Sequence, residues 1–315
     1  KVLTLDEFEK LLREYKDEQF LVVDLPGTKG DQLILMGMIK KFEELGISYE
    51  IFHYTPPNLR VPKLKRTLSW LRLNRQIAKK VGMLINKTVN LVCGKLNRIR
   101  STSADVVVLR GGGYLNDIWN DYHVLKSIIK NAHDRALIFA PHSFFFKSTS
   151  FLDFFKRCKQ PTHIFCREKY SYDLLRSIRF PKNVRIHLSH DTSLYLSKSD
   201  FAVQKWKESY ILIAPRNDRE SAVIWKMNKI PRKTKILFGD VIHVRDFNAY
   251  VNIIGNASQV YTDRLHNAIL SAILGKETFL YPNSYHKNRG VYEFSLQNFP
   301  NVRFVDSYEF LGLTL

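Results

Sequence analysis

Short apolar runs alternate with longer stretches of helical spacing along most of the chain. The first run, residues 20–25, ends in a turn with two glycines, and a helical pattern follows to residue 45. Short apolar runs bounded by turn residues are typical of buried strands. The predicted strands cover residues 20–25, 47–52, 105–109, 136–140, 163–166, 184–188, 210–214, 235–238, 260–261, 278–281 and 302–305. The predicted helices cover residues 5–15, 32–45, 247–254 and 264–274, and another begins at residue 151.

Strands that alternate with helices predict doubly wound, mostly parallel sheets, and therefore an α/β fold. The alternation is interrupted by the polar, irregular stretch from Ser197 to Glu208, which we interpret as a linker. At 315 residues the chain is long enough for two domains of ordinary size. We therefore expect an N-terminal Rossmann-like domain over residues 1–198 and a C-terminal one over residues 208–315.

Polar residues follow two successive predicted strands within the stretch from Gln259 to Glu293. Thr262 or Asp263 can cap the helix that comes next, so Arg264 and His266 fall in its first turn. Free backbone N–H groups and the helix dipole favour an anion at that position. The second strand leads into a further polar group: Asn283, Ser284, Tyr285, His286 and Lys287.

In open α/β sheets, ligands bind beyond the carboxyl ends of the strands. Two cations, two imidazoles and a helix N-terminus therefore predict a site for a small, highly charged anion. A surface salt bridge with ordinary polar neighbours is the alternative interpretation of the same residues.

The segments Thr262-Asp263-Arg264-Leu265-His266 and Asn283-Ser284-Tyr285-x-Lys287 together resemble the C-terminal signature of the polysaccharide pyruvyl transferase family. Members of that family move the enolpyruvyl unit of phosphoenolpyruvate onto a sugar, commonly closing a cyclic ketal across two hydroxyls. The resemblance implies two Rossmann-like domains with a central cleft, similar to the glycosyltransferase B architecture. It covers most of the chain and is strongest from Tyr210 to Leu296.

Earlier segments are also similar to the family. Gly27 to Asp31 resembles its Gly-Asn-x-Gly-Asp segment, with Thr28 where asparagine is usual, and the glycine triplet 111–113 and the pair Arg167-Glu168 have counterparts. A tight turn and a buried ion pair are the alternative interpretations of the last two. From the resemblance we expect the acceptor sugar to contact Gly30, Asp31, Gly112, Gly113, Tyr114, His142, Arg167 and Tyr285.

Phosphoenolpyruvate carries a phosphate and a carboxylate, so its site needs cations at both ends. The planar fork of arginine suits either group, and we assign Arg216 and Arg264 as anion clamps with Lys287 as a point charge. Asn217 and Leu265 complete the predicted donor-binding set. His266 is the predicted acid or base, because histidine ordinarily titrates near neutrality. Arg264 is the second predicted catalytic residue. His286 is the second candidate for proton transfer.

This reaction needs no metal and no cofactor, since phosphoenolpyruvate is a co-substrate, and no spacing of Cys, His or Asp suggests a metal site. Three cysteines, an odd number, are typical of a cytosolic protein with free thiols. No apolar run long enough to span a membrane and no signal peptide is evident. We therefore expect a cytoplasmic protein.

The net charge of +19 is concentrated in one segment. Residues 58–100 contain twelve Lys or Arg and no Asp or Glu, and apolar residues recur there at helical spacing. Such a segment suits peripheral contact with the inner face of an anionic membrane, where a polyprenyl-pyrophosphate-linked acceptor would lie. A solvated helix face is the alternative interpretation. Nucleic acid is not expected, because no recognition module accompanies the charge.

Two other functions remain open. A glycosyltransferase of the same fold would use Arg264 and Lys287 on the pyrophosphate of a nucleotide sugar. A noncatalytic binder of anionic glycolipid or nucleic acid would depend on residues 58–100, and its binding would be salt-sensitive. Nothing in these residues selects the sugar or its carrier.

Overall fold

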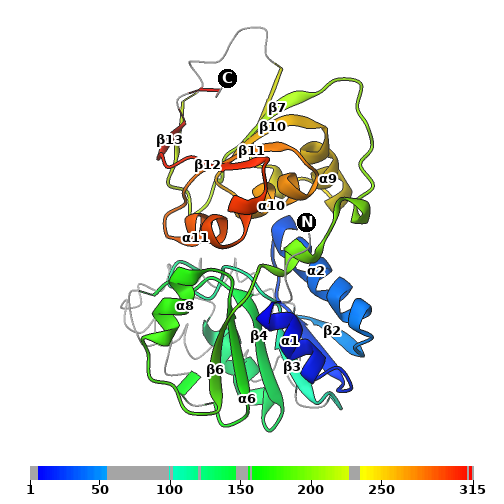
Figure 1. Ribbon diagram of the computed structural model, residues 1–315, viewed down its shortest axis with the longest axis vertical. Coiled ribbons are helices and arrows are strands. Elements are labelled where there is room, and N and C mark those ends of the chain that lie inside the picture. Colours follow the sequence, from blue (N-terminus) through cyan, green and yellow to red (C-terminus); the bar gives the residue numbers. More distant parts are fainter. Residues whose placement is uncertain are drawn as a thin grey trace, which may run out of the picture.

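The computed structural model describes residues 6–54, 99, 102–119, 122–146, 155–156, 158–226, 235–310 and 312–313. Two α/β domains lie end to end, with the N-terminal domain below and the C-terminal domain above in Figure 1. The basic segment 58–100, apart from Ile99, lies outside the described residues, as does most of the helix predicted from residue 151. No helix in the described parts of the chain is long and apolar enough to cross a bilayer.

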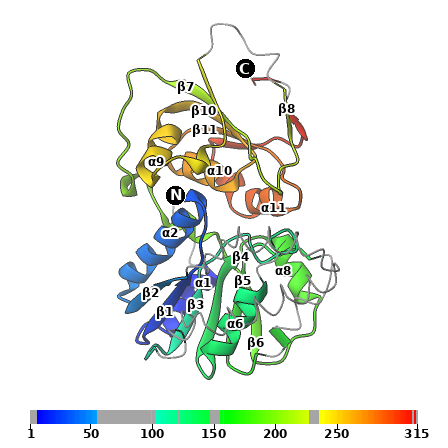
Figure 2. The ribbon, with the colours of Figure 1, turned by 180° about the vertical axis from the view of Figure 1, so that it is seen from behind.

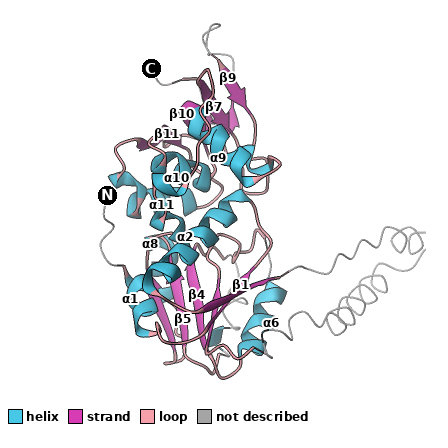
Figure 3. Ribbon diagram, turned by 90° about the vertical axis from the view of Figure 1, so that its right-hand side faces the viewer, coloured by secondary structure: helices cyan, strands magenta, loops and turns pink. Residues whose placement is uncertain are grey.

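The N-terminal domain contains a parallel sheet of six strands in the order β2-β1-β3-β4-β5-β6. Its strands are β1 (Phe20–Asp24), β2 (Tyr49–His53), β3 (Val106–Leu109), β4 (Ala136–His142), β5 (Thr162–Cys166) and β6 (Val184–Leu188). Its helices are α1 (Glu7–Glu14), α2 (Lys29–Leu45), α6 (Tyr122–Ala132) and α8 (Lys169–Arg176). Figure 3 shows α1 and α6 on opposite faces of this sheet.

Burial on both faces explains the continuous apolar runs that mark these strands in the sequence. Alternate residues of β1 enter different clusters: Leu21 and Val23 pack toward α6, whereas Phe20 and Val22 pack toward α1 and α2. The chain order of the strands reverses between β1 and β3, and a doubly wound sheet binds its ligands at such a point.

The C-terminal domain contains a parallel sheet of five strands in the order β12-β11-β10-β7-β9. Its strands are β7 (Tyr210–Ala214), β9 (Ile236–Phe238), β10 (Ala257–Thr262), β11 (Glu277–Leu280) and β12 (Val302–Phe304). A separate parallel pair joins β8 (Ile224–Trp225) to β13 (Glu309–Phe310). The helices are α9 (Phe247–Asn256), α10 (Leu265–Ile273) and α11 (Lys287–Phe294). Figure 2, the view from behind, shows α10 and α11 on the side of this domain that faces the other.

The α/β fold class and the two parallel sheets confirm the prediction from the sequence, and the differences are local. Helices α6, α8 and α11 and the pair β8–β13 were not predicted. Helix α2 begins at Lys29 rather than near residue 32, because Thr28 and Asp31 form a capping box there. His142 is the last residue of β4 rather than part of a loop after it.

Helix α2 joins the two domains. Its Leu33 belongs to the apolar cluster built from β7, β10 and α9 of the C-terminal domain. The 3₁₀ turn η2 (Thr192–Tyr195), between β6 and β7, packs so closely on α2 that a Cβ on Gly37 would lie 1.9 Å from the carbonyl oxygen of Thr192. This packing holds the N-terminus of α2 against the start of α10.

Candidate active site

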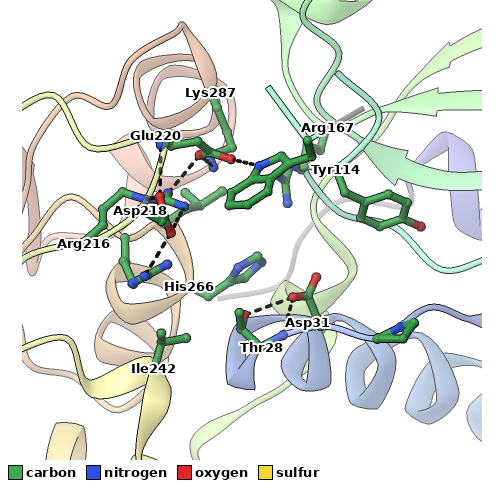
Figure 4. Close-up of a pocket in the computed structure, with 16 residues that line it drawn as sticks. Thr28, Asp31, Tyr114, Arg167, Arg216, Asp218, Glu220, Ile242, His266 and Lys287 are labelled. Carbon is green, nitrogen blue, oxygen red and sulfur yellow. Dashed lines mark hydrogen bonds and ion pairs between the residues drawn. The ribbon is translucent and has the colours of Figure 1, made fainter. Parts of the chain in front are cut away.

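A pocket of about 220 Å³ lies between the two domains, at the ends of strands from both sheets. Its N-terminal-domain wall contains the loops after β1 and β3, on the two sides of the switch point, and its other wall contains the loop after β7 and the start of α10. Figure 4 shows His266 in the middle, between Asp31 and the group formed by Arg216, Asp218 and Glu220. The lining residues are Pro26, Gly27, Thr28, Asp31, Gly113, Tyr114, Trp119, Arg167, Arg216, Asp218, Glu220, Ile242, Arg264, Leu265, His266 and Lys287.

Asp31 is held as a carboxylate on the N-terminal-domain wall. Its Oδ2 accepts hydrogen bonds from the backbone N–H and the hydroxyl of Thr28, and its Oδ1 forms a 2.7 Å ion pair with the buried Arg110. Burial by itself would raise the pKa of Asp31, but Arg110, the Thr28 N–H and His266 outweigh it and hold this pKa at about 2. Asp31 therefore presents a negative charge to the pocket at any physiological pH.

A second buried network connects Arg167, Asp191 and His266. Arg167 donates from Nη1 to Asp191 Oδ2 at 2.7 Å and from Nε to Ser143 Oγ at 2.8 Å. The same Asp191 oxygen lies 3.4 Å from Nε2 of His266, which belongs to the other domain. Burial opposes the charge on Asp191, but His266, Arg167 and Ser193 together lower its pKa. Asp191 therefore orients the imidazole of His266 at the domain boundary.

Gly30 fixes how closely His266 approaches the N-terminal domain. A Cβ on Gly30 would lie 2.6 Å from Nδ1 of His266, so only glycine leaves room for the ring against the first turn of α2. His266 thus projects from α10 but contacts the domain that carries Asp31 and Asp191.

Two arginines of the C-terminal domain are held by carboxylates. Arg216 donates from Nε and Nη2 to the two oxygens of Asp218, at 2.9 and 3.0 Å, and pairs through Nη1 with Glu220 at 2.9 Å. Arg264 pairs through Nε and Nη2 with Asp240, and Nη2 also lies 3.0 Å from Asp218. These pairs position both planar guanidinium groups in the pocket wall.

Glu220 is a buried carboxylate that connects several groups of this wall. Its Oε1 accepts from the indole N–H of Trp119, an N-terminal-domain residue, at 2.7 Å. Its Oε2 accepts from Lys287, from Arg216 and from the side-chain amide of Asn283. Burial opposes ionisation of Glu220, but Lys287, Arg216 and Trp119 lower its pKa below the ordinary value. Glu220 therefore links the cations of one domain to the aromatic side chain of the other.

Asp263, the chain neighbour of Arg264, differs from the other acids. Its Oδ1 accepts the backbone N–H of Arg216 at 2.6 Å, whereas its Oδ2 is buried without a hydrogen-bond partner in the described part of the chain. Burial raises the pKa of Asp263 to about 7, although the Arg216 N–H and the charges of Arg216 and Arg264 oppose the rise.

We expect Asp263→Asn to gain stability relative to the parent as the pH rises from about 4 to about 7. The unfolded parent releases the Asp263 proton near pH 4, but the native parent keeps it until about pH 7, so the parent loses stability across this range. Asparagine does not titrate, so the difference grows by up to about 1.4 kcal/mol per pH unit. Urea denaturation of both proteins at pH 5 and pH 8 measures it, and equal differences at both pH values would contradict the expectation.

Most of the residues that the sequence singled out lie around this one pocket. Arg216, Arg264, Leu265, His266 and Lys287 line it from the C-terminal domain. Four of the predicted acceptor residues line it from the other side: Asp31, Gly113, Tyr114 and Arg167. Their roles toward particular substrates stay predictions.

Other predicted residues lie behind the pocket wall. His142 is fully buried with its ring edge against Tyr114, and burial lowers its pKa to about 3. The Tyr285 hydroxyl lies 3.4 Å from the side-chain amide of Asn116. Three more predicted residues are not among those that line the pocket: Gly30, Gly112 and Asn217. His286 lies beside Glu168, with its Nε2 3.4 Å from Oε1 of that residue.

The sequence reasoning did not identify Trp119, Asp218, Glu220 or Asp240 as site residues. Asp218 and Glu220 follow the predicted strand 210–214 within six residues, and Asp240 follows the predicted strand 235–238 by two residues, which is the signal that could have included them. Nothing comparable marks Trp119. Within the described ranges, no group of three or more His, Cys, Asp or Glu side chains is arranged to hold a metal ion.

Comparisons with known proteins concern the family and the fold of this chain. The family model described as polysaccharide pyruvyl transferase matches residues 29–285. A functionally uncharacterised protein from Klebsiella pneumoniae subsp. pneumoniae NTUH-K2044 has a similar fold, with a TM-score of 0.61 and 23% identity over 96% of this chain and 98% of that one. Escherichia coli heptosyltransferase WaaC, solved with ADP-2-deoxy-2-fluoro heptose, aligns at a TM-score of 0.41 and 8% identity, covering 92% of this chain and 93% of that one. A search of curated proteins found no significant match.

Proposed function

This chain belongs to the polysaccharide pyruvyl transferase family, and from that premise we propose that it transfers the enolpyruvyl unit of phosphoenolpyruvate to a pair of sugar hydroxyls. The observation that carries the proposal is the convergence of three cations, Arg216, Arg264 and Lys287, with His266 on one pocket. A compact dianion or trianion is the kind of ligand that such a group binds.

The donor would occupy the C-terminal-domain side of the pocket. Guanidinium groups have five N–H hydrogens, and the pairs with Asp218, Asp240 and Glu220 use only some of them. Among the described residues, the pairs of Arg264 involve Nε and Nη2, so Nη1 would be available for a phosphate or carboxylate oxygen. Arg216 and Arg264 would thus hold the two ends of phosphoenolpyruvate while the acids keep both forks in place.

The acceptor sugar would occupy the N-terminal-domain side. Thr28, Asp31 and Tyr114 line that side with hydrogen-bonding groups, and the permanent charge on Asp31 makes it an acceptor for sugar hydroxyls. His266 lies between the two sides, so it would face both substrates. A lipid-linked acceptor, and with it a peripheral membrane contact through residues 58–100, is part of this proposal.

The reaction would balance without an additional reactant. A proton joins the methylene carbon of the donor, and a sugar hydroxyl attacks the resulting oxocarbenium-like carbon while losing its own proton. The phosphate then leaves with the electron pair of its C–O bond, and a second hydroxyl closes the ketal. Of the two hydroxyl protons, one replaces the proton given to the methylene carbon, and the other leaves with the phosphate.

Phosphate release from phosphoenolpyruvate, measured with a panel of free, nucleotide-linked and lipid-linked sugars, tests the proposal. We expect release that depends on one class of acceptor, together with a product whose mass has increased by a pyruvate ketal. A protein that binds no phosphoenolpyruvate but binds a UDP- or GDP-sugar tightly would instead be the glycosyltransferase alternative. Salt-sensitive glycolipid binding that is unchanged in Arg264→Ala would favour the noncatalytic alternative.

A further inference from the structure

Lys287 is a buried lysine whose ammonium group faces the pocket. It is the first residue of α11, it is 5% exposed, and its side chain passes close to Gly113 of the opposite domain. Its ammonium forms an ion pair with Glu220 and lies 5.3 Å from the centre of the Tyr285 ring. Such a position brings Nζ close to any ligand that Arg216 and Arg167 hold.

The charges around Lys287 do not simply keep it as an ammonium. Glu220 is its one acidic partner in the described residues, and that carboxylate is shared with Arg216, Asn283 and Trp119. Arg216, after β7, and Arg167, after β5, add positive charge from both domains. Burial lowers the pKa of Lys287, the two arginines lower it further, Glu220 raises it, and the result is about 7.

A lysine in this environment is populated as ammonium and as amine near neutral pH, and a proton donor works best under that condition. A lysine that served only as a counter-ion would bind its anion more tightly if it stayed fully protonated. The neighbouring arginines already supply permanent charge for the donor anion. The surroundings of Lys287 therefore suit proton transfer better than anion binding alone.

We propose that Lys287 is a catalytic residue that donates a proton from Nζ to the methylene carbon of the enolpyruvyl donor. This inference rests on the proposed function. The Nζ–H bond breaks and its electron pair stays on nitrogen. The π electrons of the donor's C=C bond form the new C–H bond, which makes the central carbon electrophilic. The lysine remains as a neutral amine and recovers its proton from the second acceptor hydroxyl, which closes the ketal, while the proton that His266 takes from the attacking hydroxyl leaves with the phosphate.

The two proton-transfer roles then fall on different sides of the pocket. His266 contacts Gly30 and Asp191 of the N-terminal domain, where the acceptor would bind, so it takes the proton of the attacking hydroxyl. Lys287 lies among the cations that would hold the donor. An acid and a base on opposite sides allow protonation of the donor and attack by the acceptor to occur together.

Lys287→Arg tests this assignment, because arginine keeps the positive charge but does not release its proton. We expect the variant to bind phosphoenolpyruvate within about tenfold of the parent and to lose at least about 100-fold in kcat. In the parent, kcat/KM falls as the pH rises above about 7, since the acid of the free enzyme must be protonated. The Lys287→Arg variant should lack this decrease above pH 7. The control variant Lys226→Arg, in an exposed ion pair with Glu309, should keep it.

Chemical rescue of Lys287→Ala by ethylamine is the second measurement. The cavity left by the side chain has room for a small amine, which would supply the missing proton, and we expect at least about a tenfold recovery of rate. The assignment of Lys287 would be overturned if Lys287→Arg kept the parental kcat, or if Lys287→Ala still bound phosphoenolpyruvate but was not rescued. Either result would leave the proposed function in place. A parent protein that neither binds phosphoenolpyruvate nor releases phosphate would overturn the proposed function as well.

Discussion

Replacing His266 with glutamine is expected to lower the rate of pyruvyl transfer about a thousandfold, as is usual for loss of a positioned acid or base. Glutamine resembles the imidazole in length and can still donate to Asp191, but it does not accept a proton from a hydroxyl. Because Arg216, Arg264 and Lys287 remain in place, phosphoenolpyruvate affinity should stay within about threefold of the parent. The loss should therefore fall on kcat.

Single-turnover phosphate release and calorimetric titration with phosphoenolpyruvate separate these two quantities. His133→Asn is the matched control: His133 is an exposed histidine with a positive φ of 40°, which asparagine tolerates, and it is not among the residues that line the pocket. A His266→Gln protein with near-parental kcat would rule out His266 as the group that takes the hydroxyl proton. A large loss of donor affinity would instead assign it a binding role.

Glu220→Ala is expected to cost roughly 3 kcal/mol of folding free energy, at the lower end of the range of about 3–5 kcal/mol for breaking a buried pair. The change leaves Lys287 and Arg216 without their shared carboxylate and removes the acceptor of the Trp119 indole N–H. Lys287 can release its proton near neutral pH, which limits the cost. Asp218 still pairs with Arg216, so the arginine keeps one acidic partner.

Urea denaturation of the parent and of Glu220→Ala at pH 7 measures this difference. Glu208→Ala is the control, because Glu208 and its partner Lys235 are both well exposed and such pairs contribute little. If both variants unfolded at the same urea concentration, Glu220 would not hold the two cations in place. At pH 6, where Lys287 is more fully protonated, the Glu220→Ala loss should be larger than at pH 8.

The candidate site was partly predictable from the sequence. Arg216, Arg264 and Lys287 follow different strands or start the helices after them, and the carboxyl ends of parallel strands meet at one edge of a sheet. All three line one pocket, as that rule predicts. The resemblance to the family also placed His142 and Tyr285 near the site, but neither it nor the strand-end rule could tell a lining side chain from one behind the wall.

The acids were harder to predict, because their importance lies in pairing. Asp240 is 24 residues from Arg264, and Trp119 is 101 residues from Glu220. Asp or Glu at such positions has the same local pattern whether it faces solvent or a buried guanidinium. His286 shows the opposite case, a residue that the motif favoured but that does not line the pocket. It lies within the signature segment, yet its side chain is beside Glu168.

By itself, the sequence determined the alternation of strands and helices, the parallel sheets, and the strand ends that carry cations. These follow from local burial, helical periodicity and capping, which each segment carries in its own residues. Only the tertiary structure decided which carboxylates hold Arg216, Arg264 and Lys287, and that His266 reaches Gly30 and Asp191 of the other domain. The physical reason is that these contacts depend on how α2 and η2 dock the two domains, which no short segment encodes.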